Sequence, residues 1–170
     1  MNSLTGFGPI ATADSKLLIL GSMPGVQSLQ KNQYYGHPRN AFWPIMASLF
    51  DEFDTTDYET KKHLLEQRGI AVWDVIQNCI RSGSLDAHIL KASVKPNNFR
   101  CFFNEHPHIT TVFFNGATAE KLFKNFVLST LDPSINTLVY HRLPSTSPAF
   151  AGLSLNEKIR IWKLALAAVI

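Results

Sequence analysis

Residues 17–25 read Leu17-Leu18-Ile19-Leu20-Gly21-Ser22-Met23-Pro24-Gly25, a run of apolar side chains that leads into a turn. The run from Leu17 to Leu20 is short and continuously apolar, which is typical of a strand buried on both faces of a sheet. Pro24 and Gly25 then force the chain to turn. The stretch therefore predicts a buried strand with a loop at its carboxyl end.

The alternation of strand and helix signals continues outward from this stretch. Further short runs predict strands at 70–73, 110–114 and 137–140. Further segments predict helices at 41–50, 98–105 and 117–128. Two capping-box patterns predict two more helices: one opens at Thr56-Asp57-Tyr58-Glu59 and ends at Gly69, and the other opens at Ser154-Leu155-Asn156-Glu157. We therefore expect one α/β domain over residues 1–170, with three layers (α/β/α) around a central, mostly parallel four-stranded sheet.

The composition is that of a globular chain with a mild positive charge. Hydrophobic residues make up 45% of the 170 residues, and the formal charge is +3, which permits a polyanionic partner without requiring one. Cys79 and Cys101 each stand alone, so thiolates cannot assemble a zinc or iron–sulfur site, and we expect no metal and no cofactor. Neither a leader pattern nor a membrane-length apolar run is present. We expect a monomer that acts inside the cell, in the cytoplasm and without a membrane.

In a sheet of this kind, ligands bind in the crevice beyond the carboxyl ends of the strands. The loops after Leu20, Trp73, Phe114 and Tyr140 are therefore the places to look for a site. The first loop lacks the patterns of a serine nucleophile elbow and of a phosphate-binding P-loop. By itself it fits a purely structural turn as well as a binding loop.

The segment Tyr34-Tyr35-Gly36-His37-Pro38-Arg39-Asn40-Ala41-Phe42-Trp43 concentrates aromatic, basic and amide side chains ahead of a helix. An aromatic face can stack on an unpaired base, and Arg39 can contact phosphate. Asn40 is placed to cap the helix, to face the crevice, or to do both. The segment favours a nucleic-acid ligand and leaves these roles of Asn40 open.

Three motifs in this order resemble those of the mismatch-specific uracil-DNA glycosylases: Gly-x-x-Pro-Gly at 21–25, aromatic-x-His-Pro-x-Asn-x-Phe-Trp at 35–43, and Leu-Pro-x-x-Ser at 143–147. Within that superfamily, Gly21-Ser22-Met23-Pro24-Gly25, Tyr34-Tyr35 and Leu143-Pro144-Ser145-Thr146-Ser147-Pro148 most resemble the hypoxanthine-DNA glycosylase group. Ser145 departs from the mismatch-specific pattern, which has asparagine there. The motifs span most of the chain in collinear order.

The resemblance implies roles for single residues. Met23 stands where the mismatch-specific enzymes carry the asparagine that positions the attacking water, a task for which a thioether is unsuited. In the hypoxanthine group, the asparagine that matches Asn40 takes over this role. Tyr35 matches the aromatic residue that stacks on the flipped base, and Asn115 the residue that ends the specificity strand. The resemblance places Gly21, Ser22, Met23, Tyr35 and Asn115 at the base, and His37, Arg39, Pro144, Ser145, Thr146 and Ser147 at the DNA.

These features predict a monofunctional DNA glycosylase, since no lysine occupies a motif position from which it would attack the sugar. It would flip a deaminated base out of DNA, chiefly hypoxanthine and also uracil or xanthine, and hydrolyse its bond to the sugar. Asn115 is the candidate reader, because one fixed amide can donate to the carbonyl oxygen of such a base and accept from the adjacent N–H.

Two alternatives stay open at this stage. One is a catalytically silent protein of the same fold that binds DNA lesions or mismatches. The other is an unrelated nucleotide-binding α/β protein, which the absence of Gly-x-Gly-x-x-Gly and Walker patterns disfavours.

Overall fold

The central feature of the computed structural model, which describes residues 3–54, 57–135 and 137–170, is a four-stranded sheet. All neighbouring strands in it are parallel, in the order β3 (Ile70–Asp74), β2 (Leu17–Gly21), β6 (Thr111–Asn115) and β7 (Val139–Leu143). β2 is buried along its whole length, as its continuous apolar run predicts. The expected parallel sheet is confirmed.

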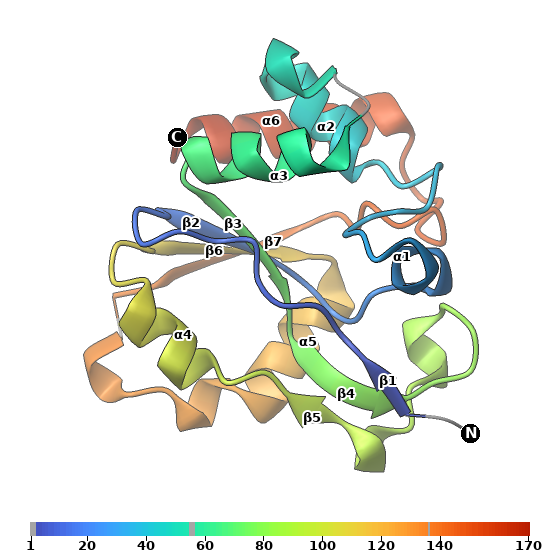
Figure 1. Cartoon of the computed structure of the whole chain (residues 1–170), viewed down its shortest axis with the longest axis vertical. Helices are drawn as coiled ribbons and strands as arrows, with labels where there is room; N and C mark the ends of the chain where they lie inside the picture. Colours follow the sequence, from blue (N-terminus) through green and yellow to red (C-terminus); the bar gives the residue numbers. More distant parts are fainter. Residues whose placement is uncertain (1–2, 55–56, 136) are drawn as a thin grey trace.

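Helices cover both faces of this sheet (Figure 1). On one side lie α2 (Phe42–Leu49), α3 (Tyr58–Gln67) and α6 (Leu155–Ala167), and on the other lie α4 (Phe99–Glu105) and α5 (Ala117–Phe126). Phe42 of α2 packs edge-on against Trp162 of α6, and Phe99 of α4 packs edge-on against Phe123 of α5. The core thus lies between helices and sheet on each side, and the three-layer architecture is confirmed.

A second sheet stands beside the first, and no sequence pattern predicted it. It is antiparallel, in the order β1 (Ser3–Thr5), β4 (Ile76–Ile80) and β5 (Lys95–Pro96). β4 follows β3 after the single residue Val75, so the chain leaves one sheet and enters the other almost without a turn (Figure 1). This sheet supports the loops on one side of the pocket described below.

The predicted helix and strand ends agree with the structure to within a few residues. The capping box at Ser154 and Glu157 is present. The N-cap of α3 is Asp57, which accepts a hydrogen bond from the Thr60 amide, whereas the predicted cap Thr56 lies outside the described residues. The fourth strand begins at Val139 instead of the predicted residue 137, since the exposed edge strand β7 carries little apolar pattern.

Short helical segments complete the connections. They are α1 (Val26–Lys31), directly after the turn that ends β2, and the 3-10 helices η1 (Asp51–Asp54), η2 (Asp86–His88), η3 (Lys91–Ser93), η4 (Leu128–Thr130) and η5 (Pro133–Ile135). Among the described residues, no helix combines the length and the apolar character needed to cross a membrane.

Candidate active site

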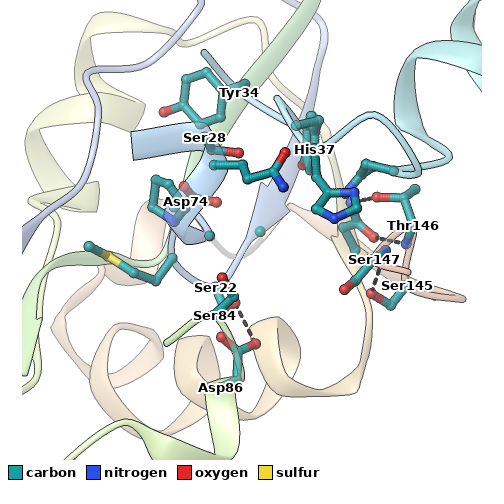
Figure 2. A pocket seen from close by; sticks show the side chains of 18 of the residues that line it. Ser22, Ser28, Tyr34, His37, Asp74, Ser84, Asp86, Ser145, Thr146 and Ser147 are labelled. Carbon is teal, nitrogen blue, oxygen red and sulfur yellow. Dashed lines mark hydrogen bonds between the residues drawn. The ribbon is translucent and has the colours of Figure 1, made fainter. Parts of the chain in front are cut away.

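A pocket opens where the carboxyl ends of β2, β3 and β6 meet the loop that follows β7 (Figure 2). This is the edge of the sheet at which parallel α/β folds bind ligands. Most of the predicted site residues come together in its lining, namely Gly21, Ser22, Met23, Tyr35, His37, Asn40, Asn115, Ser145, Thr146 and Ser147. Pro144 lines a neighbouring groove instead, and Arg39 is exposed next to His37.

The turn after β2 is held by Arg81, a buried arginine for which the sequence holds no motif. Its guanidinium donates to the carbonyl oxygens of Met23 and Pro24 over 3.5 and 2.5 Å and lies 3.8 Å from the Asp86 carboxylate. Asp86 also accepts a hydrogen bond of 2.6 Å from the Ser22 hydroxyl. The Met23 amide has no hydrogen-bond partner within the described residues. The turn is therefore fixed by its carbonyl oxygens and keeps an amide donor for a ligand.

Asn40 lines the pocket and bonds to the start of α2, but it is not the N-cap residue of that helix. Its side-chain oxygen accepts a hydrogen bond of 2.9 Å from the amide of Phe42, the first residue of α2. The residue in the N-cap position itself is Ala41, which has no side-chain cap. Asn40 also lines the pocket, where a second lone pair on its oxygen and two N–H donors stay available.

Tyr35 forms part of the pocket wall in a rare backbone conformation. Its φ of 54° lies in the left-handed region, which bulky residues seldom adopt and which is found often at functional sites. Its ring stacks on Phe42 with a centroid separation of 4.0 Å. Burial, and next the charge of Asp74, raise the pKa of the Tyr35 hydroxyl although the Asn115 side chain acts in the opposite direction, so the hydroxyl stays protonated and can donate. Stacking of this ring on a base remains a prediction.

Asn115, the last residue of β6, is paired with Thr146 from the loop after β7. The Asn115 amide donates to the Thr146 hydroxyl over 2.9 Å, and its oxygen accepts from the Thr146 backbone amide over 2.8 Å. Figure 2 shows Thr146 with Ser145, Ser147 and His37 on one side of the pocket. Asn115 therefore fixes this loop against the sheet, and its role as a base reader remains a prediction.

Asp74, the last residue of β3, is a pocket residue that no motif identified. Its side chain is only 4% exposed, and burial, together with the nearby charge of Asp86, raises its pKa to about 7 although Arg81 acts in the opposite direction. Figure 2 shows it across the pocket from Thr146. The available signal was an acidic residue directly after the apolar run at 70–73, in one of the four loops expected to line the crevice.

A metal site made of protein side chains would need several ligands close together in residues 3–54, 57–135 and 137–170. No cluster of three or more histidine, cysteine, aspartate or glutamate side chains occurs there. The pocket instead offers amides, hydroxyls, a phenol and carboxylates. These groups can orient water and hydrogen-bond a heterocycle.

Comparison with known proteins shows which family this chain belongs to. The model of the uracil DNA glycosylase superfamily matches residues 7–165, which is most of the chain. The chain belongs to the uracil DNA glycosylase superfamily. The resemblance inferred from the three motifs is thereby confirmed, and as a member of this superfamily the chain is a DNA glycosylase, whose substrate is DNA.

Two similar curated proteins come from species of Methanosarcina. A curated protein from Methanosarcina barkeri, named hypoxanthine DNA glycosylase, is 36% identical over 112 residues, which cover 65% of this chain and 70% of the relative. A protein of the same name from Methanosarcina acetivorans is 31% identical over 156 residues, or 90% of this chain and 92% of the relative. The solution NMR structure of a candidate uracil DNA glycosylase from M. acetivorans matches with a TM-score of 0.72 at 28% identity, covering 96% of this chain and 98% of that one.

Met23 is, with Ser145, one of two residues at which this glycosylase departs from the mismatch-specific uracil motif. Its side chain is 6% exposed and packs with Ile76 and Cys79 of β4 in a small apolar cluster. Met23 therefore joins the turn to the antiparallel sheet. Its side chain has neither an N–H nor a carbonyl with which to hold water.

Proposed function

We propose that this glycosylase removes deaminated bases from DNA, chiefly hypoxanthine from deoxyinosine, by hydrolysing the bond between base and sugar and leaving an abasic site. The observation that carries the proposal is that Asn40 lines the same pocket as the turn after β2. By resemblance to the hypoxanthine group, Asn40 is the residue that positions the attacking water. The names of the two curated relatives support hypoxanthine as the base. Uracil and xanthine, which also present a carbonyl oxygen next to a ring N–H, are further candidate substrates.

The chemistry needs little more than a placed water and donors aimed at the leaving base. The water oxygen bonds to C1′ while the C1′–N9 bond breaks, and the electron pair of that bond leaves with the base. The sugar passes through a state with oxocarbenium character, for which water is a sufficient nucleophile. Asn40 orients the water through its side-chain oxygen, and the free Met23 amide is a donor for charge that develops on the base. Water gives up a proton, the base gains one, and neutral hypoxanthine is released.

Binding of DNA is assigned to the residues around the pocket mouth. The proposed contacts are His37, Arg39, Pro144, Ser145, Thr146 and Ser147. The Arg39 amide donates to His37 Nδ1 over 3.0 Å, which leaves Nε2 as the protonated nitrogen of a neutral ring and so as a donor. We propose that the protein works on chromosomal DNA as a monomer, without metal or cofactor.

A panel of duplex oligonucleotides tests this function. Each duplex carries one deoxyinosine, deoxyuridine, deoxyxanthosine or ethenoadenine, and abasic sites are detected by alkaline cleavage in buffer that contains a chelator. The proposal expects abasic sites in the deoxyinosine duplex first. Tight binding of that duplex without any abasic site would show instead a silent lesion-binding protein. Loss of activity in chelator with recovery on adding zinc or magnesium would contradict the metal-free proposal.

A further inference from the structure

Two buried side-chain polar atoms stand out because they have no hydrogen-bond partner within the described residues. They are the hydroxyl oxygen of Tyr35 and Oδ2 of Asp74, and both residues line the same pocket. The Asn115 side chain is near enough to the Tyr35 hydroxyl to lower its pKa, but it forms no hydrogen bond of acceptable geometry with that hydroxyl. Buried polar atoms in folded proteins are nearly always paired, so each exception needs an explanation. Two exceptions in one pocket point to a ligand that carries two polar groups.

Gly21 brings these two groups to one place. It pairs in register with Asp74 at the ends of β2 and β3. A Cβ at Gly21 would overlap Oδ1 of Asp74 and would lie 3.7 Å from the hydroxyl oxygen of Tyr35. Only glycine fits beside this carboxyl, and both polar groups border the same glycine at the pocket floor.

The chemistry of the pair matches the edge that deamination creates. The carboxylate only accepts hydrogen bonds, whereas the protonated phenol can donate one. A deaminated base presents a ring N–H beside a carbonyl oxygen. Building on the proposed function, we propose that Asp74 accepts the ring N–H of the flipped base, N1–H in hypoxanthine, and that Tyr35 donates to the adjacent oxygen, O6. In this arrangement the Tyr35 ring stacks on Phe42 and meets the base through its hydroxyl instead of stacking on it.

This assignment explains how the pocket distinguishes a deaminated base from adenine. Adenine carries a lone pair on N1 where hypoxanthine carries a hydrogen, and that lone pair would face the Asp74 carboxylate. The amide of Asn115 already engages one N–H and one oxygen lone pair with Thr146, which leaves one of each for a ligand, whereas Asp74 Oδ2 and the Tyr35 hydroxyl have no protein partner within the described residues. Guanine shares N1–H and O6 with hypoxanthine, so its 2-amino group or its stable pairing must exclude it.

Replacing Asp74 by asparagine tests the assignment through a gain of binding. In Asp74→Asn the amide can turn either way, since Oδ2 has no protein partner that fixes it. It can then donate to N1 of adenine and accept from the amino group, or pair with hypoxanthine in the opposite orientation. We expect the affinity for free adenine to rise on the order of tenfold or more, while that for free hypoxanthine changes less. Calorimetric titration of both bases at about pH 8, where the Asp74 carboxylate predominates, measures the ratio.

Replacing Tyr35 by phenylalanine tests the second contact. The ring can still stack on Phe42, but the donor to O6 is lost, so hypoxanthine affinity should fall about three- to tenfold, the worth of one neutral hydrogen bond. Tyr34→Phe is the matched control, because the Tyr34 hydroxyl already donates to the backbone oxygen of Gly8 over 2.8 Å. Its base preference should equal that of the wild type. Melting temperatures confirm that all variants are folded.

The outcomes separate this inference from the proposed function. If Asp74→Asn leaves the ratio of hypoxanthine to adenine affinity unchanged, or lowers both affinities alike, the reading role of Asp74 is overturned even where the wild type excises hypoxanthine. If the ratio shifts as expected but the wild type releases no base from any duplex, the inference stands and the proposed function fails.

Discussion

The carboxamide of Asn115 and Thr146 are joined by two hydrogen bonds, of 2.9 and 2.8 Å, although 31 positions separate them in the chain. The backbone oxygen of Thr146 also accepts from the amide of Ala41, over 2.9 Å. Thr146 therefore links the end of β6 and the start of α2 through the loop that follows β7. These three segments carry Asn115, Asn40 and the serines of the pocket, so their relative positions depend on Thr146.

Substitutions of Asn115 distinguish a loop-fixing role from a base-reading role. Asn115→Asp can keep both contacts, because the Thr146 hydroxyl can donate to a carboxylate as readily as it accepts from an amide. Asn115→Leu loses both and leaves the Thr146 amide unpaired, which costs about 1–3 kcal/mol. We expect leucine to reduce excision of hypoxanthine more than aspartate does. A base-reading Asn115 predicts the reverse order, because aspartate would repel O6, and excision rates with circular dichroism decide between them.

Met23→Asn should destabilise the protein without improving excision of uracil. The new amide would be buried beside Ile76 and Cys79, where an unpaired polar group costs about 1–3 kcal/mol. Met23→Leu, which nearly conserves volume, should cost less than about 1.5 kcal/mol. Denaturant unfolding and uracil-release assays measure both effects. A stable asparagine variant with raised uracil release would show that this position can hold water after all.

Arg81→Met should be among the most destabilising single changes at the site. It removes the donors to the Met23 and Pro24 carbonyl oxygens and leaves Asp86 without its cation. Because the Asp86 side chain is 29% exposed, we expect a cost toward the lower end of the about 3–5 kcal/mol that is typical of breaking a buried pair. Arg39→Met is the matched control, since Arg39 is exposed. It should change the free energy of unfolding by less than about 0.5 kcal/mol. It should also reduce, by about one, the slope of the logarithm of the DNA-binding constant against the logarithm of the salt concentration. Equal unfolding free energies for the two variants would argue against a role of Arg81 in holding the turn after β2.

The raised pKa of Asp74 makes stability depend on pH. Aspartate in the unfolded chain titrates near its ordinary value of 3.8, but burial raises the pKa of Asp74 in the folded protein to about 7, with Asp86 adding to the rise and Arg81 opposing it. Between these values the folded protein holds a proton that the unfolded chain lacks. The stabilising contribution of this proton to the free energy of unfolding is complete below about pH 4 and is lost as the pH rises through about 7.

The variant Asp74→Asn cannot make this proton-linked contribution. Its melting temperature minus that of the wild type should therefore increase between about pH 4 and pH 8. The other charged groups near Asp74, namely Asp86 and Arg81, and the phenols of Tyr34 and Tyr35 are present in both proteins, so the difference isolates Asp74. A difference that is flat across this range would mean that Asp74 is ionised throughout.

The parallel sheet was predictable because its inner strands are continuous apolar runs. β2 and β3 are buried along their lengths, so almost every side chain in them carries the signal. β4 was missed because its burial is mixed and because it follows β3 without a turn residue. The antiparallel sheet forms through pairing with β1, which lies more than 70 positions earlier in the chain. No local pattern encodes such a contact.

The candidate site shows the same division between local motifs and tertiary contacts. Asn40 and Tyr35 lie in a local motif and were identified from it. Asp74 differs, because its burial depends on the approach of Gly21 from the neighbouring strand. Arg81 acts on carbonyl oxygens 57 and 58 positions away. The sequence shows these side chains, but only the folded chain shows what they face.

The most direct test compares the wild type with Asn40→Ala in single-turnover release of hypoxanthine from a duplex with one deoxyinosine. If Asn40 orients the attacking water, the rate of the chemical step should fall by about 10²-fold or more while DNA affinity changes little. Loss of the hydrogen bond to the Phe42 amide should also lower stability by roughly 0.5–2 kcal/mol, so rates are compared well below the melting temperature. A folded Asn40→Ala protein that releases hypoxanthine at the wild-type rate would contradict the account.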